Sequence, residues 1–321
     1  MSPSASTRDR YGEVLLELGR RDPNVVVIGG DLNKSVGTIP FSQQFPERFF
    51  DLGAAEQNMV SIAAGLAASG KVPFVSTFAV FATGRAYDQL RVGVAQSDLG
   101  VKVVVTHAGL ITGEDGISAQ SIEDLALMCA LPTFRVVVPA DAVETAGAVR
   151  AAAATPGPFY IRLSRPATEV VLPADYQFRL GKAHTMREGN DATIIACGIM
   201  VAAAMKAADA LARSGVQCRV LNMSTLRPID EQAIVRAAAE TGAIVTAEEH
   251  LAQGGLGAII ASVAGQRCPV PVRIVAVPDG YAESGKPDEL LARYHLTPAD
   301  VEAAVRDVLQ RKGLAPRPRG T

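Results

Sequence analysis

The chain has 321 residues, enough for two domains that each bury a core of their own. Its formal net charge of −2 and its pI of about 6.1 lack the basic footprint that nucleic-acid binding requires. We expect neither a secretory leader nor a membrane span, because the amino terminus has no apolar signal core and no uncharged run reaches about 20 apolar residues. The four cysteines lie far apart without zinc-ligand spacing, which predicts reduced thiols in a cytoplasmic protein.

The first half of the chain alternates short apolar strands with helical segments. Strands are predicted at residues 25–28, 73–76, 101–106, 135–138 and 159–163, and helices at residues 55–69, 85–96, 122–130 and 142–154. Their residues are apolar on both faces of the strand, so neither face is suited to lie against water. Such strands in alternation with helices are typical of a parallel sheet covered on both faces.

The alternation stops in a polar, proline-containing stretch between residues 166 and 187. It resumes with strands at residues 192–196, 217–221, 243–246 and 272–276 and helices at residues 201–213, 231–240, 257–264 and 297–310. We therefore predict two consecutive α/β domains, residues 1–167 and 188–312, with a linker over residues 168–187 and a flexible tail over residues 313–321.

Glu56 is the most informative side chain of the first half. An apolar strand ends at residues 49–52, Gly53 breaks it, and a helix follows whose buried face carries Met59 and Val60. Glu56 precedes these two by three and four residues, so it shares the buried stripe. A buried carboxylate is unfavourable unless it is paired or protonated. The position of Glu56 alone is equally consistent with a second interpretation, in which it is a partly solvated glutamate in the first helical turn, stabilised by the helix dipole.

Three more motifs follow Glu56 along the chain. Phe78 and Phe81 come after the next strand, Thr106-His107 ends the strand after that, and then comes Gly113-Glu114-Asp115-Gly116. In this order and spacing the motifs resemble the pyrimidine-binding half of transketolases, which are thiamine diphosphate enzymes. The resemblance extends from about residue 7 to residue 310 and includes the C-terminal region.

The resemblance implies how the chain contacts thiamine diphosphate. Glu56 would bond the aminopyrimidine ring and favour the tautomer that activates the cofactor. Phe78 and Phe81 would pack on that ring, although their spacing alone favours ordinary core. Asp31 would lie near the thiazolium and a subunit interface.

The resemblance also implies a sugar-phosphate site. His107 would be catalytic together with Glu56 and would touch the sugar, and Asp115 would accept a hydrogen bond from a substrate hydroxyl. Four residues match the phosphate contacts of the family: Arg8, Ser35, His107 and Arg165. For the two arginines, position alone favours a solvated surface charge. His250 is interpreted as structural or interfacial.

The chain departs from the family pattern at three places. Ala119 stands where relatives have a histidine close to the reacting carbon. Gly84 replaces a third aromatic residue, for which Tyr87 one turn later is a candidate substitute. The chain also lacks the G-D-G motif and the asparagine with which the family binds the diphosphate and its metal ion.

These features predict the C-terminal subunit of a split transketolase. A separate N-terminal subunit would bind the diphosphate and Mg²⁺ in an α₂β₂ assembly, and the enzyme would transfer a two-carbon ketol unit between sugar phosphates. The alternatives are the β subunit of a 2-oxo acid dehydrogenase, an enzyme of the deoxyxylulose phosphate synthase type, and a non-catalytic scaffold subunit.

Overall fold

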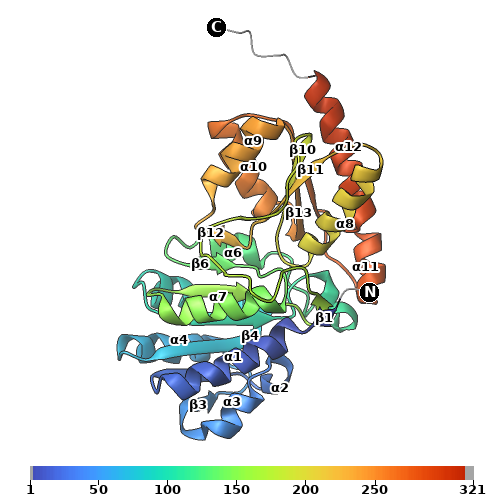
Figure 1. Ribbon diagram of the computed structural model, residues 1–321. Helices are drawn as coiled ribbons and strands as arrows, with labels where there is room; N and C mark the ends of the chain where they lie inside the picture. The colour runs from blue at the N-terminus through green and yellow to red at the C-terminus, as the bar shows by residue number, and fades with distance from the viewer. Residues whose placement is uncertain (1–2, 315–321) are drawn as a thin grey trace.

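The protein is described from a computed structural model covering residues 3–314, with side chains to residue 313; residues 315–321 of the predicted tail lie outside the described residues. Two α/β units follow one another along the chain. Figure 1 shows the N-terminal unit, blue to green, below the C-terminal unit, yellow to red. The two consecutive α/β units predicted from the sequence are thus confirmed.

A seven-stranded sheet forms the centre of the first unit, in the order β12-β6-β7-β5-β4-β2-β3. The strands are β2 (Val25–Gly29), β3 (Phe49–Asp51), β4 (Val72–Phe78), β5 (Lys102–Thr106), β6 (Arg135–Val137), β7 (Phe159–Arg162) and β12 (Thr225–Arg227). All pairs are parallel except β12 with β6. β12 follows the predicted linker in sequence, so the second half of the chain contributes a strand to the first sheet.

Helices cover both faces of this sheet, as the apolar strands predicted. Val25 and Val27 pack into a core with α1 and α7, whereas Val26 and Ile28 pack into another with α4, because successive strand residues point to opposite faces. The helices are α1 (Thr7–Arg21), α2 (Asn33–Val36), α3 (Ile39–Gln44), α4 (Glu56–Ala68), α5 (Ala79–Arg85), α6 (Asp124–Cys129) and α7 (Ala142–Ala154).

Several parts of the first unit differ from the prediction, and the short helices α2 and α3 were not predicted. The helix expected over residues 85–96 is present over residues 87–95 and is π-helical over Gln89–Ala95, and a bend at Ala86 separates it from the preceding helix α5. The N-terminal helix α1 was not predicted at all. Its start is capped by Ser6, whose hydroxyl accepts from the Asp9 N–H at 3.1 Å, and its face with Tyr11 and Leu15 is fully buried.

The second unit contains a five-stranded sheet in the order β14-β13-β10-β11-β9. Its strands are β9 (His184–Arg187), β10 (Ala192–Ala196), β11 (Cys218–Asn222), β13 (Ile244–Leu251) and β14 (Val272–Val277). Its helices are α8 (Met200–Arg213), α9 (Glu231–Thr241), α10 (Leu256–Arg267), α11 (Pro287–Arg293) and α12 (Pro298–Leu314). In Figure 1, α8 and α12 lie on one side of the sheet and α9 and α10 on the other.

The segment predicted as a linker has regular structure at both ends. β8 (Thr168–Glu169) pairs with β1 (Ser4–Ala5), and β9 is the antiparallel edge of the second sheet. Between them, the Val171 and Leu172 N–H groups both donate to Asp141 Oδ2 at 2.8 Å. The linker is therefore hydrogen-bonded to the N-terminus of α7. The exact domain boundaries at residues 167 and 188 stay a prediction.

A buried ion pair lies where the two units meet. Arg162 Nε donates to Asp124 Oδ2 at 2.9 Å, and the Tyr160 hydroxyl donates to the same oxygen at 2.7 Å. Arg162 Nη2 donates to the carbonyl oxygens of Ser121 and Glu249, each at 3.0 Å. The guanidinium thus joins β7, the segment before α6, and β13 of the second unit.

Two further properties follow from the helices and thiols of the described residues. None of these helices is both long enough and apolar enough to cross a membrane. The four cysteines are free thiols, of which Cys197 and Cys218 are buried.

We expect Asp124→Ala to lower the free energy of unfolding by about 3–5 kcal/mol, because it leaves the buried Arg162 guanidinium without its counter-ion. Asp209→Ala is the matched control, since Asp209 pairs with Arg187 at 2.6 Å but is largely exposed, and should change stability by less than about 1 kcal/mol. Chemical denaturation of the chain measures both. Equal losses in the two variants would contradict a structural role for the buried pair.

Candidate active site

The predicted site residues gather at one edge of the first sheet. Asp31 follows β2, Glu56 follows β3, and His107 follows β5, while Phe78 ends β4 and Arg165 comes three residues after β7. Because these strands are parallel, their carboxyl ends meet at the same edge. Ligand sites in sheets of this kind lie there.

Glu56 is the first residue of α4 and is 4% exposed, so the burial predicted from its position is confirmed. Its Oε1 accepts a hydrogen bond from Arg85 Nη1 at 3.0 Å. Arg85 is about half exposed, so it reaches the carboxylate from the solvent side. A carboxylate at a helix N-terminus with one exposed partner is accessible to a ligand that replaces that partner.

A continuous row of stacked side chains connects Glu56 to His107. The Arg85 guanidinium carbon lies 3.9 Å from the centre of the Phe81 ring. The Phe81 and Phe78 rings are stacked with centroids 5.4 Å apart, and the Phe78 and His107 rings with centroids 3.6 Å apart. The two residues predicted to be catalytic therefore stand at opposite ends of one aromatic platform.

His107 is held in an unusual backbone conformation, with φ of 58°, and is 3% exposed. Its Nδ1 shares a hydrogen bond of 2.8 Å with the Thr106 hydroxyl, and its Nε2 lies 3.7 Å from Asp115 Oδ2. Burial lowers the pKa of His107 to about 3, with further lowering by the positive charges of Arg165 and Arg8. The ring is therefore neutral near pH 7.

The phosphate residues predicted from the family lie on the His107 side of the site. Arg8 Nη1 donates to the Ser35 carbonyl oxygen at 3.2 Å, and the buried Arg8 Nε has no hydrogen-bond partner among the described residues. Arg165 Nη1 donates to the Thr112 carbonyl oxygen at 2.9 Å, and its Nε lies 3.4 Å from Asp115 Oδ2. Two guanidinium groups, one with a buried Nε that makes no hydrogen bond and lies 3.6 Å from Asp9 Oδ1, fit an anionic ligand.

Asp31 is exposed at the same edge, with φ of 65°. Its N–H donates to Asp51 Oδ1 at 3.1 Å, and the Gly53 N–H donates to the same oxygen at 3.0 Å. The Gly53 N–H is the main reason that the pKa of Asp51 is lowered. Asp51, which sequence reasoning did not single out, organises the turns before α2 and α4.

Ala119 and Gly84, the two positions where the family has a larger side chain, have different surroundings. Ala119 is 6% exposed and packs in a small apolar cluster with Phe78 and Val36, beside the aromatic platform. A Cβ at Gly84 would have no heavy atom within 4 Å, so this position borders open space. Tyr87 does not join the platform, because it packs on the main core and donates to the Leu127 carbonyl oxygen at 3.0 Å.

Arg85 is the site residue that sequence reasoning missed. It stands four residues after Phe81, a spacing that places two side chains on one helical face. That spacing was the available signal, but it does not show that Glu56, 29 residues earlier, would lie beside the guanidinium.

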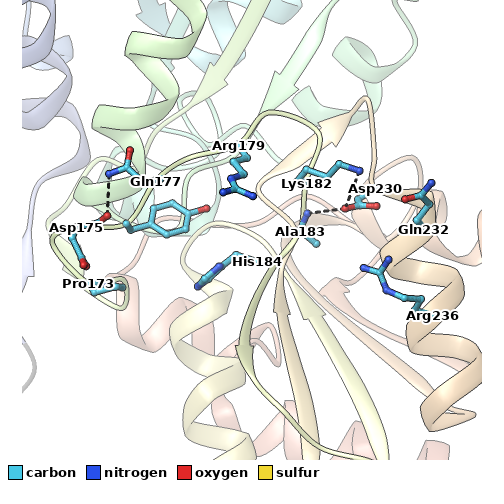
Figure 2. A pocket seen from close by; sticks show the side chains of 11 residues that line it. Pro173, Asp175, Gln177, Arg179, Lys182, Ala183, His184, Asp230, Gln232 and Arg236 are labelled. Carbon is cyan, nitrogen blue, oxygen red and sulfur yellow. Dashed lines mark hydrogen bonds and ion pairs between the residues drawn. The ribbon is translucent and has the colours of Figure 1, made fainter.

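The chain also has a cavity that holds none of the predicted site residues. It has a volume of about 550 Å³ and lies between the linker and α9. Figure 2 shows Arg179, Lys182 and Arg236 around it, with Asp230 bonded to the Ala183 backbone.

Among the described residues, no group of three or more His, Cys, Asp or Glu is arranged to hold a metal ion.

Comparison with known proteins identifies the family. A profile described as the pyrimidine binding domain of transketolase matches residues 3–170, and one described as the transketolase C-terminal domain matches residues 181–301. The chain belongs to the transketolase family. This family uses thiamine diphosphate, so the cofactor class implied by the sequence motifs is supported.

Two relatives of similar length are named as transketolase subunits. The chain is 42% identical over 306 residues to the 6-deoxy-6-sulfo-D-fructose transketolase subunit of Clostridium sp. strain MSTE9, covering 95% of each. It is 40% identical over 290 residues to an apulose-4-phosphate transketolase subunit of Phocaeicola vulgatus, covering 90% of this chain and 93% of that one. By contrast, 95% of the chain matches only 49% of transketolase-like protein 2 of Mus musculus, at 38% identity.

A solved structure described as a split gene transketolase, inactive β4 tetramer, has the same fold. It superposes with a TM-score of 0.90 at 48% identity, covering 96% of this chain and 99% of that one. The prediction of a split-transketolase C-terminal subunit is thus confirmed at the level of the family and its two-domain form.

We expect the His107 ring to remain neutral from pH 8 to pH 5. Its folded pKa lies below the value of about 6.5 in unfolded chains, so folding stability should fall as pH drops below 6.5, and less so in His107→Gln. Imidazole NMR signals of labelled protein, assigned by that variant, measure the titration. A His107 midpoint near 6.5 would mean that the ring is not enclosed as described.

Proposed function

We propose that this chain is the pyrimidine-binding subunit of a two-chain transketolase that transfers a two-carbon ketol unit from a ketose phosphate to an aldose phosphate. The observation that carries the proposal is the row from Glu56 through Phe81 and Phe78 to His107, with Arg8 and Arg165 beyond it. One end suits an aminopyrimidine and the other suits a sugar phosphate. The names of the similar subunits support the same reaction class.

The residues present fit thiamine diphosphate at the Glu56 end. The buried Glu56 carboxylate can accept a hydrogen bond from a protonated ring nitrogen, while the neighbouring aromatic faces pack against the ring. When bound, the cofactor supplies the nucleophilic carbon and the electron sink. Arg85 bonds Glu56 and covers Phe81, so it has to move aside for a pyrimidine ring to occupy that place.

The diphosphate and Mg²⁺ would be held mainly by a separate N-terminal subunit. The sequence lacks the family motif for them, and the chain spans only half of a longer relative. The similar split-gene protein is described as inactive in its β4 form, which favours an active α₂β₂ assembly with the partner. We place this assembly in the cytoplasm, in carbohydrate metabolism of the pentose phosphate type.

The substrate pocket differs from that of ordinary transketolases at Ala119. Ala119 packs beside Phe78 where the family has a histidine, and its methyl group is smaller than an imidazole ring. Two relatives are named for 6-deoxy-6-sulfo-D-fructose and for apulose-4-phosphate. We therefore propose a donor that is bulkier or differently substituted than a simple ketose phosphate.

The other functions are less well supported. A 2-oxo acid dehydrogenase subunit has no need of two arginines converging on His107. The synthase type is disfavoured by the two-chain form of the similar proteins. A scaffold role does not require a buried Glu56 at the edge of an aromatic platform.

The function is tested by reconstitution with the N-terminal subunit. The chain alone should show negligible ketol transfer, and the complex should be active. In the complex, Glu56→Gln should retain folding but slow deuterium exchange at the cofactor C2 by about a hundredfold or more, because an amide cannot favour the required tautomer. Turnover by the isolated chain would overturn the two-chain proposal, and wild-type exchange in Glu56→Gln would remove Glu56 from activation.

Arg8→Ala should raise KM for phosphorylated sugars roughly ten- to a hundredfold and leave KM for unphosphorylated ones nearly unchanged, because it removes a charge-assisted hydrogen bond to phosphate. Arg10→Ala is the control, since Arg10 lies on the same helix, has a side chain that is 41% exposed, and pairs with Glu13 at 2.7 Å. Steady-state kinetics on both substrate types give the comparison. A similar rise for both types would place the phosphate elsewhere.

A further inference from the structure

Glu249 of the second unit reaches across the unit boundary to the loop that carries Asp115. It lies near the end of β13 and is 4% exposed. Its Oε1 accepts from the Ile111 N–H at 2.6 Å, and its carboxylate also accepts from the Leu110 N–H. Two backbone donors at the start of residues 110–115 are therefore satisfied by one side chain of the other unit.

Gly109 shows how close this contact is. Its φ of 82° is a conformation that favours glycine, and a Cβ there would lie 2.2 Å from the Glu249 carboxyl carbon. No larger residue fits between the loop and the carboxylate. The Gly109 N–H in turn donates to the Ser121 carbonyl oxygen at 2.7 Å, which brings the two ends of the loop together.

The far end of the loop is bound to the same strand. Arg162 Nη2 donates to both the Ser121 and the Glu249 carbonyl oxygens. The Leu251 N–H donates to the Ile122 carbonyl oxygen at 2.8 Å, and His250 Nε2 accepts from the Ala126 N–H at 3.3 Å. The end of β13 thus holds both ends of the loop, and His250 takes part as a structural residue.

Between its two anchored ends, the loop contacts the side chains proposed to bind substrate. The Thr112 carbonyl oxygen and Glu114 Oε2 accept from Arg165 Nη1, at 2.9 and 3.1 Å. Asp115 lies close to both Arg165 and His107. Displacement of this loop would move Arg165 and the partner of His107 together.

We infer that Glu249 is a positioning residue, through which the C-terminal domain sets the geometry of residues 109–116, the substrate-facing part of the loop over residues 109–122. Its neighbour Glu248 provides an internal comparison. Glu248 is equally buried and accepts from the Leu256 and Gly257 N–H groups at 2.6 and 2.7 Å, so it caps α10 and does not hold the loop. Adjacent glutamates on one strand therefore serve two different segments.

Hydrogen exchange of the full-length chain, resolved by segment, tests this assignment without any activity. Glu249→Ala should speed exchange in residues 109–116 about tenfold or more, because the Leu110 and Ile111 donors lose their acceptor. Glu248→Ala should speed exchange at the start of α10 and leave the loop as in wild type. Glu249→Gln retains one acceptor oxygen and should give a smaller effect on the loop, and it carries the test if the alanine variant does not fold.

The kinetic arm rests on the proposed function. In the reconstituted complex, Glu249→Ala should raise KM for the sugar phosphate about tenfold or more, with partial rescue by Gln. Deuterium exchange at the cofactor C2, which depends on Glu56, should stay unchanged. Wild-type loop protection in both Glu249 variants, or a loosened loop without any rise in KM, would overturn the inference. A complex with no ketol transfer at all would refute the proposed function, and loop exchange would still decide the role of Glu249.

Discussion

The buried guanidinium of Arg162 is the constraint on which the rest of the structure depends. A charge in the interior is unfavourable unless each of its donors finds an acceptor, and here the acceptors come from three segments: Asp124, the Ser121 carbonyl and the Glu249 carbonyl. Satisfying this one group joins the first sheet, the loop before α6 and the end of β13. The same junction takes two further carboxyl groups out of water, so burial raises the pKa of Glu248 to about 8 and of Glu249 to about 7. These groups are tolerated because backbone N–H donors meet them.

From this junction the geometry extends outward to the site. The loop held by β13 carries the acceptors of Arg165, and the strand ends carry Glu56, Phe78 and His107. The aromatic platform then links a carboxylate at one end with a neutral imidazole at the other. The ring and the anion proposed to bind at these two ends would thereby be held at a fixed separation. The C-terminal unit takes part in this arrangement although it supplies no residue to the platform.

The sequence predicted most of the strands and helices because their signals are local. Apolar runs bounded by Gly or Asp marked β2, β4, β5 and β10 to within two residues, and the start of α4 was placed within one residue. The helix predicted over residues 85–96 is present over residues 87–95, but apolar periodicity did not show that it is π-helical over Gln89–Ala95 or that a separate helix, α5, precedes it. α1 was missed because its charged residues hide a narrow buried face of Tyr11, Val14 and Leu15. β12 could not be foreseen, since three residues of the second half pair with a strand about 90 positions earlier.

By itself, the sequence determined the two α/β units, the buried Glu56 and the order of motifs that places the chain in its family. Each single helix, strand or motif behind these predictions depends on side-chain type and spacing over fewer than about twenty residues, which is the range of helix and strand periodicity. Only the tertiary structure decided which groups meet: Arg85 with Glu56, Tyr87 with α6 instead of the platform, and Glu249 with the loop 138 residues before it. Such contacts are set by strand order and by the need for every buried polar group to make a hydrogen bond. Neither can be inferred from the spacing of residues that are close in sequence.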